Sequence, residues 1–198
     1  MTAGQTSGNP LLDHLRDRTE AEHRRLEAAV DIDARIADAA AYRALLERLW
    51  GFYAPLEAAL AAVAWPAGAA PAGIAAKAPL LASDLGALGV AVPESLPACG
   101  ELPDVGDWRD AIGCHYVLEG STLGGRIILK RMRREQEQSG DGERLPAAFF
   151  SAYGEVTGER WRGFCGFLRS HSGDGDVLSR APAAAEATFA TLERWLRR

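Results

Sequence analysis

Residues 116–125, with the sequence YVLEGSTLGG, place three glycines and a serine within six positions of an otherwise helical run from 108 to about 136. Each glycine inside a helix costs roughly 0.8–1 kcal/mol relative to alanine, so the chain must need the space that these glycines leave. Gly120 lies one helical turn from Gly124, and Ser121 one turn from Gly125, which makes one continuous surface almost without side chains. Such a surface suits either close packing against another helix or contact with a flat ligand, and the glycines alone leave both readings open.

The remainder of the chain also favours helices. No stretch alternates apolar and polar residues over a convincing length, and apolar residues recur instead at helical spacing. The helices are expected to cover approximately residues 10–30, 38–65, 79–88, 108–136, 147–153, 155–170 and 180–197. No internal repeat is visible, and 198 residues suffice for one domain with a sizeable core. We expect an all-α, single-domain, multi-helix bundle over residues 1–198, with 1–9 as a flexible N-terminus.

Local signals predict where several elements begin and end. Asn9 followed by proline is typical of a helix start, and Ser179 or its neighbour is expected to cap the last helix, with Pro182 in its first turn. Residues 139–142 read as a turn. The segment 65–78, rich in alanine, glycine and proline, carries no charge before Lys77 and is expected to be a structurally passive loop.

Composition excludes several classes of partner. The net charge of −5 gives no general attraction to nucleic acid. No apolar run approaches the ~20 residues that a membrane-spanning helix requires, and the first residues lack the pattern of a signal peptide. We therefore expect a cytoplasmic protein with no membrane and no nucleic-acid partner. The cysteines Cys99, Cys114 and Cys165 are widely spaced and odd in number, so they are expected to be reduced packing residues.

The chain has four histidines that could act in acid-base chemistry or bind a metal: His14, His23, His115 and His171. On the first helix, Arg16, His23 and Glu27 fall on one face, and Glu27 can orient the imidazole of His23 as a metal ligand requires. A di-iron site built on Glu20 and His23 would need a second Glu-x-x-His pair, which the sequence lacks. The chain also lacks a nucleophile elbow, a P-loop and a dinucleotide fingerprint.

Two of these segments resemble the haem oxygenases. Residues 116–125 are similar to the distal-helix motif of that family, and residues 22–27, EHRRLE, to its proximal-helix segment. The similarity continues through residues 80–85 and the Trp161-Arg162 helix, so it covers most of the chain. It is greatest to the bacterial members, including those found beside biliverdin-binding phytochromes.

The resemblance implies that haem lies between the first helix and the glycine-bearing helix, as both substrate and cofactor. His23 would be the axial ligand of the iron, and Glu27 would support it. Gly120, Ser121 and Gly124 would form the catalytic distal surface. Arg16, Tyr116 and Arg162 match the family's propionate-binding residues by position, although Arg16 and Arg162 can also be read as solvated charges.

The implied reaction is that of a haem-degrading monooxygenase, which yields biliverdin, carbon monoxide and ferrous iron from haem and O2. With no flavin or NAD site, the electrons would come from a ferredoxin or flavodoxin with its reductase, and a phytochrome could receive the biliverdin. The basic residues Lys130, Arg131, Arg133 and Arg134 can be read as the donor's docking surface or as a solvated helix end. Animal members carry an aspartate where this chain has Ser121, so a non-catalytic haem carrier or sensor is the alternative.

Overall fold

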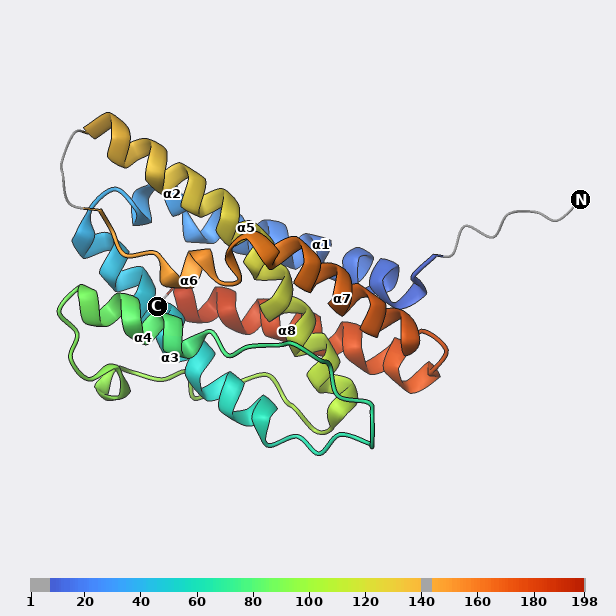
Figure 1. Cartoon of the computed structure of the whole chain (residues 1–198). Helices are drawn as coiled ribbons and strands as arrows, with labels where there is room; N and C mark the ends of the chain where they lie inside the picture. Colours follow the sequence, from blue (N-terminus) through green and yellow to red (C-terminus); the bar gives the residue numbers. More distant parts are fainter. Residues whose placement is uncertain (1–7, 140–143, 198) are drawn as a thin grey trace, which may run out of the picture.

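The computed structural model describes residues 8–139 and 144–197, and within these ranges the chain forms eight α-helices and no strand (Figure 1). The elements are α1 (Pro10–Val30), α2 (Ile32–Arg35), α3 (Ala39–Ala61), α4 (Ala78–Ala87), α5 (Trp108–Ser139), α6 (Ala148–Ser151), α7 (Thr157–Ser170) and α8 (Gly175–Leu196), with 3-10 turns η1 (Pro93–Ser95) and η2 (Gly154–Val156). The prediction of an all-α bundle is confirmed. No helix in the described part of the chain is long and apolar enough to cross a membrane.

The N-terminal segment is described only from Gly8 onward, and most of the turn predicted at 139–142 also falls outside the described residues. Asn9 caps α1 as predicted, because its side chain accepts a hydrogen bond from the backbone N–H of Leu12. Its Nδ2 also donates to the carbonyl oxygen of Cys165 at 2.8 Å. The start of α1 is thereby tied to α7.

Helix α8 lies at the centre of the bundle and packs against α1, α3 and α5 (Figure 1). Small residues permit the close contact between α8 and α5. A Cβ at Gly113 of α5 would lie only 2.8 Å from the backbone nitrogen of Ala185 on α8. One helix-packing glycine therefore does occur in α5, two turns before the side-chain-poor stretch.

The start of α8 differs from the prediction. The helix begins at Gly175 rather than near Ser179, because the side chain of Asp174 accepts hydrogen bonds from the backbone N–H groups of Asp176 and Val177. Pro182 therefore lies inside the helix and not in its first turn. Val177 is fully buried, so the additional turn contributes apolar surface to the core.

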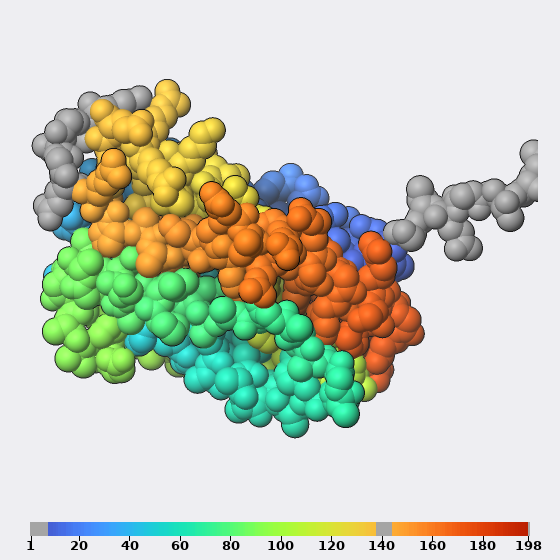
Figure 2. Space-filling view, in the orientation of Figure 1, coloured from blue at the N-terminus to red at the C-terminus, as the bar shows by residue number. Residues whose placement is uncertain are grey.

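The segment between α3 and α4 is not passive, which corrects the prediction for 65–78. Trp65 packs against Trp108 of α5, with ring centroids 6.1 Å apart. Further along, the backbone N–H of Ala75 donates to the hydroxyl of Tyr153, and Lys77 is almost fully buried. On the face shown in Figure 2, this segment lies directly beneath the orange α6–α7 region. Contacts with side chains from distant parts of the chain fix the path of this segment. Local sequence patterns do not reveal such contacts.

Candidate functional site

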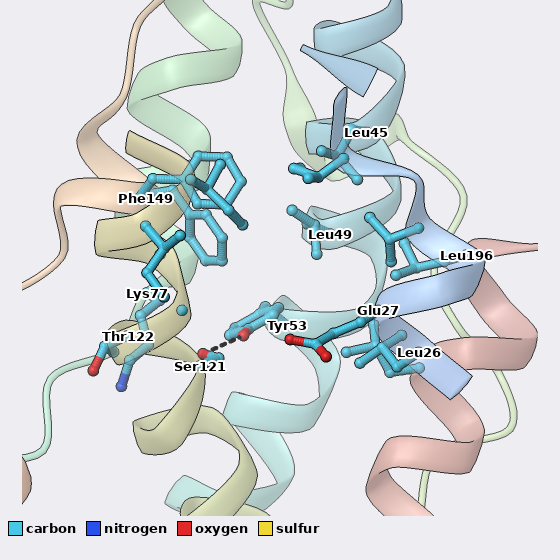
Figure 3. A pocket seen from close by; sticks show the side chains of 18 of the residues that line it. Leu26, Glu27, Leu45, Leu49, Tyr53, Lys77, Ser121, Thr122, Phe149 and Leu196 are labelled. Atoms are coloured by element: carbon cyan, nitrogen blue, oxygen red, sulfur yellow. Dashed lines mark hydrogen bonds between the residues drawn. The ribbon is translucent and has the colours of Figure 1, made fainter. Parts of the chain in front are cut away.

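A cavity of about 460 Å³, called here the main cavity, lies between α1 and α5. Residues of α2, α3, α6 and α8 close its sides, and most of them are leucine, isoleucine or phenylalanine (Figure 3). The α1 wall comprises His23, Leu26, Glu27 and Val30, and the α5 wall Ser121, Thr122, Gly124, Gly125, Ile127, Ile128 and Arg131. Its volume lies within the ~300–1,000 Å³ typical of cofactor and small-molecule sites.

His23 lies on the α1 wall with the partner that the sequence predicts. Its Nδ1 is 3.5 Å from Oε2 of Glu27, one helical turn further along. The imidazole also meets the ring of Phe189 edge-on, with centroids 5.6 Å apart. A histidine that binds a metal through one ring nitrogen commonly uses the other to contact a carboxylate, which fixes the tautomer and strengthens the ligand.

The other three histidines lie outside the lining of the main cavity. His115 is largely buried beside a second, smaller cavity, where burial and then the charge of Lys77 lower its pKa to about 4. The ring of His171 packs against Trp108 and Phe167. Of the four candidates, His23 alone is placed to bind a ligand in the main cavity.

The three glycines of the side-chain-poor stretch meet three different surroundings. A Cβ at Gly124 would have no atom within 4 Å, and this residue lines the main cavity. A Cβ at Gly125 would lie 3.1 Å from the carbonyl oxygen of Phe150, so this glycine also allows α6 to approach α5. Gly120 lies outside the cavity lining and faces Trp161, whose ring would be 3.8 Å from an added Cβ. Close packing therefore accounts for Gly125, whereas Gly124 leaves open space in the main cavity.

Ser121 lines the main cavity and forms a pair with a residue that the sequence did not single out. The hydroxyl of Tyr53 on α3 lies 3.0 Å from Oγ of Ser121 (Figure 3). Ser121 donates its single hydroxyl hydrogen to the carbonyl oxygen of Leu118 at 2.8 Å. Tyr53 is therefore the donor to Ser121 in this arrangement. The remaining lone pairs of the two oxygens can accept hydrogen bonds from water in the cavity.

The three residues assigned to the propionates lie outside the lining of the main cavity. Arg16 and Tyr116 are neighbours: burial raises the pKa of Tyr116, while a hydrogen bond with Thr19 and the charge of Arg16 oppose that rise. The ring of Tyr116 packs against Trp161, with centroids 6.0 Å apart. Arg162 follows Trp161 on α7 and is exposed. Arg16 and Tyr116 are thus brought together, and Arg162 lies on the neighbouring helix.

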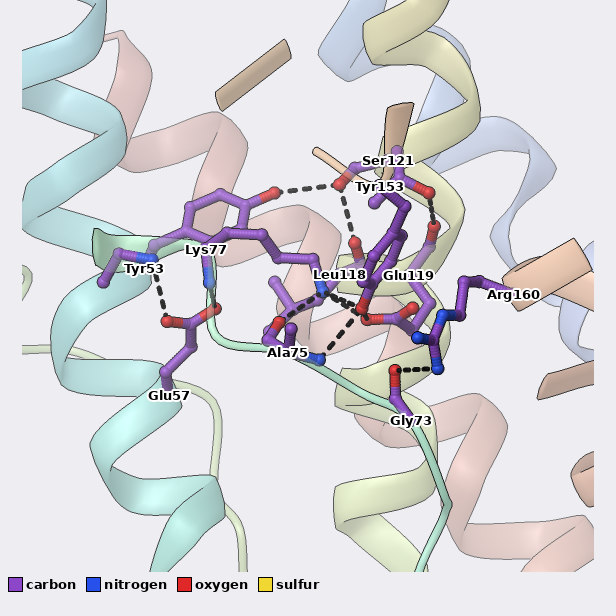
Figure 4. Close-up of polar contacts among 12 residues, drawn as sticks. Tyr53, Glu57, Gly73, Ala75, Lys77, Leu118, Glu119, Ser121, Tyr153 and Arg160 are labelled. Atoms are coloured by element: carbon purple, nitrogen blue, oxygen red, sulfur yellow. Dashed lines mark hydrogen bonds and ion pairs between the residues drawn. The ribbon is translucent and has the colours of Figure 1, made fainter. Parts of the chain in front are cut away.

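A buried polar cluster borders the α5 wall, and sequence reasoning missed all of it. Lys77 pairs with Glu119, and both side chains are only 3 % exposed (Figure 4). The hydroxyl of Tyr153 donates to Oε1 of Glu119 at 3.1 Å. The available signal was weak: Lys77 is the first charge after a neutral segment, and Glu119 precedes the glycines directly.

These surroundings fit a haem group. An apolar space of this size with a carboxylate-supported imidazole on one side and bare main chain on the other can accept a flat macrocycle, bind its iron and leave room for O2. The walls of leucine, isoleucine and phenylalanine would exclude water from the ring.

Comparison with known protein families identifies a match over most of the chain. The family model described as heme oxygenase matches residues 9–198, which include every site residue considered above. No curated protein and no solved structure matches the chain. A match over nearly the whole length shows that the chain belongs to the haem oxygenase family, whose members bind and degrade haem.

Proposed function

We propose that this chain converts haem to biliverdin, carbon monoxide and ferrous iron, with O2 and electrons from a separate protein. The observation that carries the proposal is the main cavity itself. It holds the His23–Glu27 pair on its α1 wall and the open backbone of Gly124 on its α5 wall. Haem would be both the substrate and the group that activates oxygen.

On the α1 side, His23 would bind the iron and Glu27 would hold its Nδ1. The carboxylate keeps the imidazole in one tautomer and raises its basicity, which favours a stable iron–nitrogen bond. The edge-on contact with Phe189 restricts rotation of the ring. These residues position the haem; they do not transfer protons.

On the α5 side, Gly124 provides the space and Ser121 the polar contact. A side chain at Gly124 would enter the main cavity and take up space that haem and O2 would need. Tyr53 and Ser121 can hold a water molecule there by accepting hydrogen bonds from it, since their own hydroxyl hydrogens are donated to Ser121 and to Leu118. This pair would serve in place of the aspartate found in animal members, and Gly120 would support the wall from the Trp161 side.

The haem propionates would extend toward Arg16, Tyr116 and Arg162. A guanidinium group and a phenol are suited to charge-assisted hydrogen bonds with carboxylates at the mouth of a site. The main cavity would hold only the apolar macrocycle. Propionates outside that lining would remain hydrated, so the free-energy cost of burying two negative charges would be avoided.

Electrons would arrive at the basic end of α5. Lys130, Arg131, Arg133 and Arg134 are all exposed, and Arg131 also lines the main cavity. Arg131 forms an ion pair with Asp33 at 3.1 Å. This contact neutralises only one of the four positive charges of the cluster. An acidic ferredoxin or flavodoxin would be attracted to this surface, with a rate of association that falls as salt is added.

A haem titration followed by turnover tests the proposal. The purified chain should take up one haem, show a Soret band, and lose it on addition of a reducing system in air as a biliverdin band appears. A Soret band that persists under these conditions would favour the alternative of a haem carrier or sensor. The absence of stoichiometric haem uptake would exclude both functions.

A further inference from the structure

The cluster around Lys77 connects three segments that are distant in the sequence. The ammonium group of Lys77 pairs with Glu119 of α5, donates to the carbonyl oxygen of Ala75 at 3.1 Å, and lies 3.4 Å from the hydroxyl of Tyr153. Tyr153 in turn donates to Glu119 and accepts from the backbone N–H of Ala75. In Figure 4 these groups converge on one point beside α5. All three N–H donors of Lys77 therefore have an acceptor.

Glu119 directly precedes the part of α5 that contains three glycines. Its own carbonyl oxygen accepts the hydroxyl of Thr122 at 2.6 Å, and the preceding carbonyl, of Leu118, accepts the hydroxyl of Ser121 at 2.8 Å. Hydroxyl groups that bond back to the helix in this way weaken and bend it. With Gly120, Gly124 and Gly125 following, this turn of α5 has little intrinsic rigidity. The side chain of Glu119 anchors it from outside the helix.

Lys77 also borders two cavities, the main cavity and a smaller one. It contributes to the lining of the main cavity together with Ser121 and Thr122, and to a second cavity of about 230 Å³ together with Glu57 and His115. The other charged residues that line the main cavity, Glu27 and Arg131, have more than half of their side chains exposed. Of the three charged residues Glu27, Lys77 and Arg131 in the lining of the main cavity, Lys77 is thus the buried one.

We propose that Lys77 and Glu119 are positioning residues for the distal half of the haem site. Their ion pair fixes residues 118–125 so that Ser121 meets Tyr53 and Gly124 faces the haem. The inference rests on the proposed function, since it assigns these residues a role in directing oxygen onto haem. Neither residue is a catalytic group, because both act through Ser121 and Gly124.

The chemistry of the pair supports a positioning role over a purely stabilising one. Removing two charges from water is expensive, so a buried ion pair is often no more stable than apolar residues of the same volume. A leucine and a methionine could fill this space as well. Directed hydrogen bonds, in contrast, fix the rotation and height of a helix turn, which apolar contacts do less specifically.

The test compares two charge-free double variants of α5 ion pairs. Lys77→Met with Glu119→Leu removes the proposed positioning pair and leaves no unpaired charge. The matched control, Arg180→Met with Asp110→Leu, removes a pair between α8 and α5 whose α5 member is 11 residues, or roughly 16 Å of helix, before Ser121. Each variant is loaded with haem and measured for haem affinity, for the pH of the acid–alkaline transition of ferric haem, and for biliverdin formed per O2 consumed.

The expected result is a specific loss of distal function. The Lys77/Glu119 variant should bind haem like the wild type, shift the acid–alkaline transition, and form about tenfold less biliverdin per O2, as expected for misplaced reacting groups. The control should match the wild type in all three. Unchanged spectra and yield in the Lys77/Glu119 variant, or equal losses in the control, would overturn the proposal.

A second variant, Lys77→Arg, tests the proposal in case the Lys77/Glu119 double variant does not fold. Lys77→Arg keeps the charge but moves its donors, so it should shift the acid–alkaline transition in the same direction. A wild-type transition in that variant would count against positioning. If the wild type itself forms no biliverdin, the proposed function fails, while the spectral comparison still tests whether Lys77 and Glu119 shape the distal surface.

Discussion

The hydroxyl of Tyr53 lies 3.0 Å from Oγ of Ser121, although the two residues are 68 positions apart and belong to α3 and α5. Tyr53 is only 2 % exposed, and burial raises the pKa of its phenol, so the hydroxyl keeps its hydrogen at neutral pH and can donate it. Ser121 donates to Leu118 and accepts from Tyr53. Hydrogen bonds to both Tyr53 and Leu118 therefore fix the position of Oγ of Ser121.

Removing either hydroxyl should impair turnover more than haem binding. Tyr53→Phe keeps the ring and its edge contact with Phe149 but deletes the donor to Ser121. We expect biliverdin formation to fall roughly 100- to 1,000-fold in Tyr53→Phe and in Ser121→Ala, as for the loss of one preorganised polar group. Because the two groups act as a pair, the double variant should lose little more than either single one. Independent, multiplying losses would contradict a shared role.

His23→Ala should abolish normal axial ligation and most of the turnover. The substitution removes the one imidazole in the main cavity, and the remaining apolar walls should still retain haem weakly. The measurement is the Soret maximum, followed by biliverdin yield, with and without added imidazole, which should partly restore the spectrum. His14→Ala, on the same helix but outside the cavity lining, serves as the control. A wild-type yield from His23→Ala would exclude His23 as the ligand.

The sequence predicted those parts of the fold and site that local patterns encode. Helical spacing located α1, α3, α4 and α5 to within a few residues, because the apolar face of each helix repeats with the turn of the helix. The pairing of His23 with Glu27 follows from a separation of four residues on one helix. The side-chain-poor stretch was likewise visible, since it depends on residue type alone.

Contacts between distant segments could not be predicted in the same way. Nothing in the sequence around Tyr53 distinguishes it from an ordinary core tyrosine, and its role depends on where α3 crosses α5. Lys77 follows a neutral segment that reads as a loop, yet its ammonium is buried against Glu119. The cap predicted at Ser179 was wrong, because Asp174 caps α8 and the additional turn buries Val177 against residues that are distant in the sequence.

Gly124→Leu should prevent productive haem binding without unfolding the protein. A side chain there would enter open space in the main cavity, so the apo chain should keep its helical circular dichroism and most of its thermal stability. Haem affinity and biliverdin yield should both fall at least about tenfold, because the new side chain occupies the distal side. Gly166→Leu on α7 is a matched control, because an added Cβ there also meets nothing within 4 Å, outside the main cavity.

Gly120→Leu should behave differently from Gly124→Leu. An added Cβ at Gly120 would be in ordinary contact with Trp161, so the larger side chain would press on α7 rather than enter the cavity. We expect a lower melting temperature with a smaller loss of haem affinity than in Gly124→Leu. Equal loss of haem affinity in both variants would show that Gly120 also borders the bound haem directly.

His115 should make the protein less stable in mild acid. Burial, and then the charge of Lys77, lower its pKa from 6.5 to about 4 in the folded protein. Between these values the unfolded chain binds a proton that the folded chain does not, so stability falls as pH falls from 6.5 toward 4. The loss attributable to this histidine approaches about 3 kcal/mol at pH 4. Its Nδ1 is also buried without a hydrogen-bond partner among the described residues.

Urea unfolding of the wild type and of His115→Leu between pH 4.5 and 7.5 measures this contribution. Carboxylates also titrate in this range, so the difference between the two proteins, rather than either curve, isolates the histidine. The free energy of unfolding of the variant, relative to that of the wild type, should rise as the pH is lowered. The reason is that leucine, unlike His115, cannot take up a proton on unfolding. His171→Leu, which removes another partly buried histidine, next to the end of α7, is measured alongside for comparison. Parallel curves for wild type and His115→Leu would mean that His115 is protonated equally in both states, and so would contradict its placement in a buried, neutral form beside Lys77.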